Sequence, residues 1–70
     1  MTYFIIALHG PGFSRYWTEK PELGLMDEAA HYETREAAQD ALQLVPTFTV
    51  ADEQDNDVDL QPEILEMQIP

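Results

Sequence analysis

The chain has 70 residues and a mass of 8.0 kDa, enough for one hydrophobic core but not for a second, so we expect residues 1–70 to form a single domain. Its 14 acidic and 3 basic residues give a formal net charge of −11, and an apolar fraction of 44% is typical of a folded chain. This charge argues against direct binding to nucleic acid or to an anionic membrane, because both attract positively charged proteins. Since the sequence has no cysteine, disulfides and thiolate chemistry are excluded.

The N-terminal part of the chain predicts a β-hairpin. Residues 2–8 read as a strand, and the two alternating sets 3, 5, 7 and 4, 6, 8 are both apolar, which is typical of a central strand covered on both faces. Residues 9–12, His-Gly-Pro-Gly, have the composition of a turn, and residues 13–18 read as the second strand. In that strand Trp17 is expected in the core, and Tyr16 points to the opposite face.

A single helix is expected in the middle of the chain. Residues 19–28 contain proline and glycine and read as a loop, and residues 31–33 form either a short strand or an extended lead-in to the helix. Thr34 has the properties of an N-cap, and Pro46 is expected to end the helix. The apolar residues of this segment recur at helical spacing, at Ala37, Ala38, Ala41, Leu42 and Val45.

Two further strands are expected on either side of an acidic loop. Residues 47–51 alternate as a strand with Phe48 and Val50 inward, residues 52–59 form the loop, and residues 63–69 read as the last strand. The resulting order, β-β-α-β-β, predicts an α+β fold: a small antiparallel sheet of about four strands with one α-helix packed on one face.

No constellation of catalytic residues is recognisable in the sequence. The two histidines, His9 and His31, are not spaced with each other as zinc ligands are. Ser14 lacks a nucleophile elbow around it. We therefore expect no enzymatic activity and no cofactor.

The acidic loop also invites a calcium hypothesis. Asp55, Asp57 and Asp59 match the first ligand positions of a calcium-binding loop, and Glu66 falls at the twelfth position. The pattern fails at the sixth position, where the sharp turn requires glycine and this chain has Leu60. No specific metal site is predicted, although a weak cation-binding module remains an alternative.

The strongest functional signal is the uneven distribution of charge. Residues 1–35 carry five carboxylates and three basic side chains, a net charge of −2, whereas residues 36–70 carry nine carboxylates and no lysine or arginine. If the acidic loop is extended, Asp55, Asp57 and Asp59 form a row of three carboxylates spaced about 6.6 Å apart, a spacing comparable with backbone phosphates. An acidic surface that binds a basic partner is therefore predicted at Glu36, Asp40, Asp52, Glu53, Asp55, Asp57 and Asp59. The alternative is that these side chains serve solubility alone.

Tyr16 is a secondary candidate for partner contact. It follows Arg15 and precedes Trp17, and Tyr, Trp and Arg are enriched at protein interfaces. Trp17 itself is expected to belong to the core.

One stretch resembles a known group of proteins. Tyr16-Trp17-Thr18, a loop, and then the segment 29–38, Ala-Ala-His-Tyr-Glu-Thr-Arg-Glu-Ala-Ala, resemble a pattern found in small phage and prophage proteins. With the small size and the acidity, the chain resembles phage-encoded inhibitors of the anti-CRISPR type, several of which occupy nucleic-acid-binding surfaces. The resemblance implies a DNA mimic that inhibits a basic nucleic-acid-binding protein such as a CRISPR effector complex.

Other functions and assemblies stay open at this point. The chain is alternatively a small acidic structural or interaction protein, either homodimeric or associated with a virion, and both a monomer and a homodimer are compatible with the sequence. The start of the chain has no basic region before its apolar run, and no apolar run reaches the ~18 residues of a membrane span. We therefore expect a cytoplasmic protein that does not contact a membrane, located in the host cell if it is phage-encoded.

Overall fold

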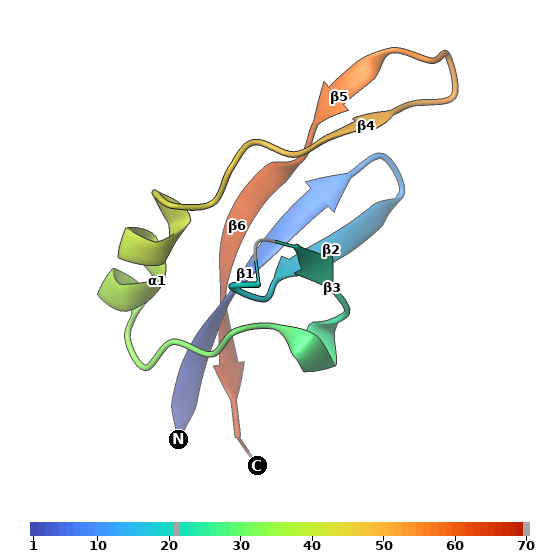
Figure 1. The fold of residues 1–70 in the computed structure, drawn as a ribbon. Coiled ribbons are helices and arrows are strands. Elements are labelled where there is room, and N and C mark those ends of the chain that lie inside the picture. Colours follow the sequence, from blue (N-terminus) through green and yellow to red (C-terminus); the bar gives the residue numbers. More distant parts are fainter. Residues whose placement is uncertain (21, 70) are drawn as a thin grey trace.

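A computed structural model describes residues 1–20 and 22–69 and has the predicted α+β class. An antiparallel sheet of four strands, in the order β3-β2-β1-β6, carries one helix, α1 (Arg35–Leu42), on one face (Figure 1). A short 3-10 turn, η1 (Met26–Glu28), follows β3. The strands of the main sheet are β1 (Thr2–Gly10), β2 (Phe13–Trp17), β3 (Leu23–Gly24) and β6 (Gln61–Gln68), and a second sheet pairs β4 (Thr49–Ala51) with β5 (Asp57–Asp59).

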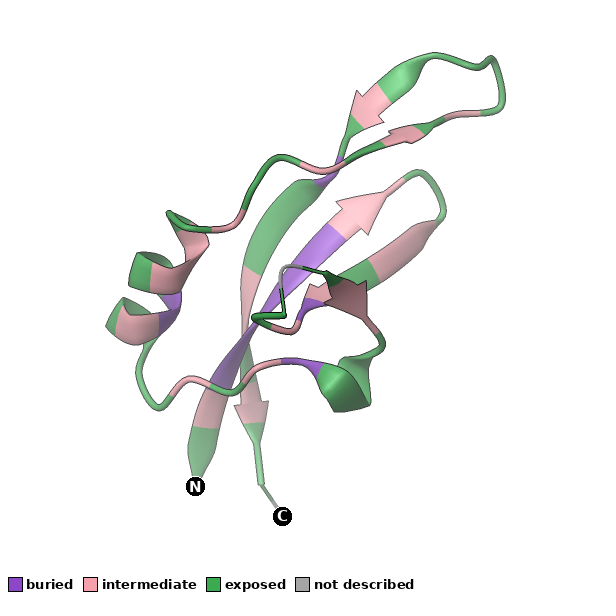
Figure 2. Cartoon of the chain, viewed as in Figure 1, coloured by how far each residue is buried: buried purple, intermediate pink, exposed green. Residues whose placement is uncertain are grey.

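The first strand is central, as its two apolar faces predicted. It pairs with β6 along most of its length and with β2 through residues 7–10, and residues 4–8 are all buried (Figure 2). Beyond the end of β2, Tyr32 pairs with the edge of β1 that β2 leaves free. The Tyr32 backbone N–H donates to the Phe4 carbonyl at 2.9 Å, and the Phe4 N–H donates to the Tyr32 carbonyl at 2.8 Å. Residues 31–33 are thus an extended lead-in to the helix with one isolated bridge.

The hydrophobic core lies between the sheet and the helix. Its buried centre consists of Ile6, Leu8, Trp17 and Leu60, and Trp17 is only 6% exposed, as expected for a core residue. Ala38 of α1 is fully buried, while Glu36, Gln39, Asp40 and Gln43 are exposed on the outer side of the helix segment, so the amphipathic pattern is confirmed.

Two glycines lie in and beside the turn between β1 and β2. Gly12 has a φ of 81°, a left-handed conformation that costs other residues energy. Gly10 is closely packed, because a Cβ atom there would lie 2.7 Å from both Leu60 Cδ2 and Phe13 Cζ, and these side chains would have to move. The Phe13 ring therefore rests directly on the backbone of Gly10.

The helix begins where the sequence predicted and ends sooner. The Thr34 hydroxyl accepts the Ala37 N–H at 3.0 Å, so Thr34 is the N-cap. The expectation that Pro46 ends the helix was wrong, because α1 stops at Leu42. The chain then tightens into a turn in which the Leu44 and Val45 N–H groups bond to carbonyls three residues earlier.

The strands of the second half also differ from the prediction. The expected strand at 47–51 is shorter and pairs with β5, inside the predicted acidic loop, instead of joining the main sheet. This occurs because Val58 lies opposite Val50, and both are half-buried between exposed neighbours. The fourth strand of the main sheet is β3, in the region predicted as a loop. β6 starts earlier than expected and includes Pro62, which an edge strand tolerates.

Candidate functional site

A two-stranded acidic arm extends from the end of the main sheet (Figure 1). We use "acidic arm" for residues 49–59, which comprise β4, the turn 52–56 and β5. Its base is joined to the body by the Leu60 N–H, which donates to the Phe48 carbonyl at 2.9 Å, and by the Phe48 ring, which lies 6.2 Å from the Trp17 ring between centroids. The arm contains five of the seven predicted acidic site residues, Asp52, Glu53, Asp55, Asp57 and Asp59.

One of these carboxylates builds the turn of the arm. Asp52 Oδ1 accepts the backbone N–H groups of Gln54 at 2.8 Å and Asn56 at 2.9 Å. The Asp52 N–H donates to the Asn56 carbonyl, and the Asp55 N–H donates to the Asp52 carbonyl, with Asp55 in the left-handed region at a φ of 64°. Asp52 therefore has a structural role that the sequence analysis missed, although aspartate before an Asn/Asp-rich turn is a known signal for it.

The remaining carboxylates of the arm point to solvent. Asp57 and Asp59 are exposed and lie two residues apart in β5, so their side chains share one face of the ribbon, opposite Val58. Asp55 is exposed in the turn, outside the strand. The extended row of three carboxylates considered from the sequence is thus a row of two, with Asp55 beyond its end.

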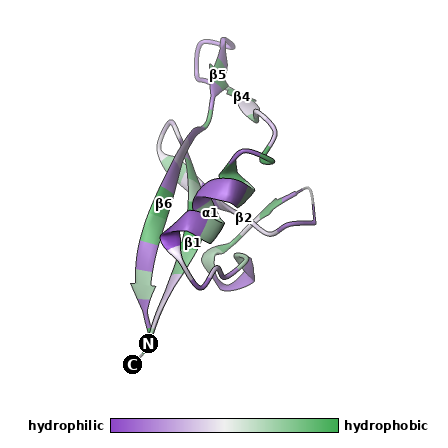
Figure 3. Cartoon of the chain, turned by 90° about the vertical axis from the view of Figure 1, so that its left-hand side faces the viewer, coloured by the Kyte–Doolittle hydropathy of each residue, from purple (hydrophilic) through white to green (hydrophobic). Residues whose placement is uncertain are grey.

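Glu36 and Asp40 belong to a separate acidic surface. Both are exposed and lie one helical turn apart on α1. The arm lies beyond the helix, at the end of the molecule away from the two termini, in two perpendicular views (Figures 1 and 3). The predicted site residues therefore form two groups, and the structure does not bring them into one cluster.

No lysine or arginine of the described residues forms an ion pair with the acidic arm. Across residues 1–20 and 22–69, the one ion pair joins His9 Nε2 to Glu63 Oε1 at 2.9 Å, and no lysine or arginine pairs with a carboxylate. The Arg15 guanidinium lies over the Phe13 ring and that of Arg35 over the Phe4 ring, each at 5.1 Å from the centroid. The exposed carboxylates of the arm thus form no ion pair within the described residues.

Three hydrogen-bonded side chains form a row on the face of the main sheet opposite the core. The sequence did not predict this row. His9 of β1 bonds through Nδ1 to the Ser14 hydroxyl of β2 at 2.8 Å and through Nε2 to Glu63 of β6 at 2.9 Å. The row crosses three strands, because His9 lies opposite Ser14 and diagonally across from Glu63. Only the strand register brings these residues together, so sequence spacing carries no signal for them.

Tyr16, the secondary candidate, is half-buried in the middle of the main sheet. It lies opposite Ala7 of β1 and opposite Gly24 of β3. Its neighbour Trp17 points to the other face and into the core. The role of Tyr16 in partner contact stays a prediction.

The calcium-loop spacing does not correspond to one loop. Asp57 and Asp59 lie in β5, whereas Glu66 lies in β6, opposite Phe4 in the main sheet. No group of three or more potential metal ligands gathers within the described part of the chain. The spacing that suggested a site therefore joins residues of two different sheets.

Comparison with known proteins finds no match to this chain among protein families, curated proteins or solved structures. Within residues 1–20 and 22–69, no helix has both the length and the apolar character needed to cross a bilayer. The α-helix in this part of the chain, α1, has eight residues.

Proposed function

We propose that the acidic arm binds the basic groove of a nucleic-acid-binding protein and competes there with DNA. The observation that carries this proposal is that five carboxylates on an 11-residue ribbon have no lysine or arginine partner within the described chain. Such a ribbon attracts a positively charged groove over long distances and excludes phosphates once it is bound.

The shape of the arm supports this mode of binding. It has two strands and one turn, and its exposed carboxylates lie along β5 and at the tip. A two-stranded ribbon is narrow enough to enter a groove that accommodates a nucleic-acid strand. Asp52 holds the turn by accepting two backbone N–H groups, so the acidic tip is ordered before binding and loses less entropy on association.

The class of partner follows from the resemblance of residues 16–38 and of the overall acidity to phage-encoded inhibitors. We propose a guide-loaded CRISPR effector complex as the partner, which places the chain in the cytoplasm of the host cell. Because the net charge is −11, the chain is expected to bind this protein and not its nucleic acid.

The test measures binding of the chain to a panel of purified CRISPR effector complexes, with and without target DNA. A triple variant, Asp55→Asn, Asp57→Asn and Asp59→Asn, removes three charges while keeping size and leaving Asp52 to hold the turn. It should bind at least about tenfold more weakly and with a shallower salt dependence, because three exposed charge contacts are lost. The double variant Glu36→Gln and Asp40→Asn, which removes two charges, is the control on the separate helical surface.

Wild-type affinity of the triple variant, or undiminished binding in the presence of saturating target DNA, would contradict the proposal. Two rival functions have separate readouts. A structural homodimer would show a dimer by sedimentation whose stability is unaffected by the triple variant. A weak cation-binding module would bind calcium at millimolar concentration by calorimetry.

A further inference from the structure

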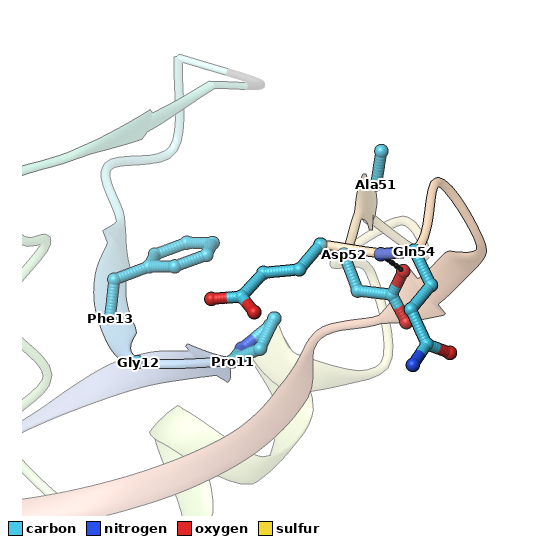
Figure 4. A pocket seen from close by; sticks show the side chains of 7 residues that line it. Pro11, Gly12, Phe13, Ala51, Asp52 and Gln54 are labelled. Carbon is cyan, nitrogen blue, oxygen red and sulfur yellow. Dashed lines mark hydrogen bonds between the residues drawn. The ribbon is translucent and has the colours of Figure 1, made fainter.

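A cleft of about 590 Å³ opens between the acidic arm and the turn joining β1 to β2 (Figure 4). Pro11, Gly12 and Phe13 line it from the β1–β2 turn, and residues 51–54 line it from the arm. Figure 4 shows the Phe13 ring on one side and Asp52 and Gln54 on the other. The cleft thus has an aromatic wall and a polar, acidic wall, contributed by two hairpins that are far apart in the sequence.

The two acidic residues of the cleft differ in whether their carboxylates already accept hydrogen bonds. Asp52 is half-buried, and its Oδ1 already accepts two backbone N–H groups. Glu53 is exposed, and its carboxylate takes part in no hydrogen bond or ion pair with the rest of residues 1–20 and 22–69. Glu53 is therefore the group left to bind a ligand.

The aromatic wall favours a planar cation. The Phe13 ring is held in place by its contact with Gly10, and the guanidinium of Arg15 lies 5.1 Å from its centroid, so this ring already accepts a guanidinium group. Guanidinium stacks on aromatic faces and pairs with carboxylates, whereas ammonium is more strongly hydrated. The chain's charge of −11 disfavours an anionic ligand.

We propose that this cleft receives an arginine side chain of the basic partner, with the guanidinium between the Glu53 carboxylate and the Phe13 ring. The inference rests on the proposed function, because it names the contact through which the arm would recognise a basic protein. It adds a discrete pocket to what is otherwise a diffuse electrostatic attraction.

The test uses the peptide acetyl-Gly-Arg-Gly-amide as the probe and follows backbone amide shifts of the labelled protein by NMR. The citrulline peptide, which has the same shape without the charge, is the ligand control. We expect shifts concentrated at Gly12, Phe13 and residues 53–54. Glu53→Gln should weaken binding about fivefold, the size of one exposed charged contact, whereas Glu36→Gln should change it less than about twofold, although both remove one charge. Phe13→Leu, checked for folding in the same spectra, should also weaken binding.

Three results would overturn the pocket. These are equal losses of peptide affinity with Glu53→Gln and Glu36→Gln, equal binding of the citrulline peptide and the arginine peptide, or amide shifts spread over α1. The larger proposal is judged separately, with the effector complex. If Glu53→Gln binds the effector as the wild type does while the triple variant at Asp55, Asp57 and Asp59 does not, the pocket is wrong and the arm still binds. If both bind as the wild type does, the proposed function fails as well.

Discussion

The Tyr32 hydroxyl donates a hydrogen bond to Glu19 Oε1 at 2.6 Å. This bond joins the extended segment that leads into α1 to Glu19, which lies two residues after the end of β2. The Tyr32 backbone is also paired with Phe4, so the ring sits on a fixed segment. Burial, reinforced by the hydrogen bond to Glu19 and by its negative charge, raises the pKa of the Tyr32 phenol above its ordinary range. Glu19 holds this contact in a left-handed backbone conformation, with a φ of 71°.

Replacing Tyr32 with phenylalanine should lower the free energy of unfolding by about 1 kcal/mol at pH 7, the typical value of one such hydrogen bond. Because the folded-state pKa is raised, this tyrosine's stabilisation is complete below about pH 10 and is lost as the pH rises above that value. Urea unfolding of both proteins from pH 7 to pH 11 measures the effect. The difference between them should shrink above pH 10, and Tyr3→Phe, which keeps Tyr32, should retain the alkaline loss. A constant difference across the series would contradict this assignment.

Replacing Asp52 with alanine should disorder the tip of the acidic arm without unfolding the domain. The two N–H groups that the carboxylate accepts lose their partner, a cost of about 1–2 kcal/mol that falls on the arm because the core is elsewhere. Amide hydrogen exchange of Gln54 and Asn56 is the measurement, and both should exchange faster. Asp52→Asn keeps an accepting oxygen and serves as the control. Unchanged protection in the alanine variant would show that Asp52 does not hold the turn.

Added salt should stabilise this protein. Its carboxylates repel one another, and no lysine or arginine in the described chain forms an ion pair that salt would weaken. The melting temperature should therefore rise by several degrees between about 20 mM and about 500 mM sodium chloride. The rise should be smaller in the variant that neutralises Asp55, Asp57 and Asp59. A melting temperature that falls with salt would mean that favourable charge pairs dominate.

Trp17→Ala should destabilise the fold by roughly 3–5 kcal/mol, enough to unfold a domain of this size.

Phe48→Leu is the more informative change, because Phe48 lies at the base of the arm and is in contact range of the Trp17 ring. It should lower stability by about 1 kcal/mol while increasing the hydrogen exchange of residues 49–59 more than that of β1. Equal increases in both regions would show that the arm does not move independently.

The parts of the fold that were predictable are those set by local patterns. The two apolar faces of residues 4–8 identified a central strand, and Thr34 identified the start of the helix through the chemistry of its hydroxyl. The position of the helix end was not predicted, because a proline sets only the limit beyond which a helix cannot continue. The α-helix ends at Leu42, four residues before that limit.

The missed elements depend on partners distant in the sequence. β3 has two residues and exists because Leu23 and Gly24 lie beside Trp17 and Tyr16. In β5, one valine between two aspartates gives too weak an alternation to be seen without its partner Val50. The same reason explains the site: the five acidic residues of the arm were found by composition, whereas the cleft between Phe13 and Glu53 depends on how two hairpins are placed.

The pairing of Thr2 with Gln68 has a consequence for the order of events during synthesis. The β1–β2 hairpin and the acidic arm join residues close in sequence and can form as soon as they leave the ribosome. One edge of β1, however, has no neighbour until residues 61–68 have been made. During that interval the apolar residues 4–8 lack the part of their native cover that β6 provides, so the nascent chain is exposed to aggregation and to chaperones until β6 has been translated.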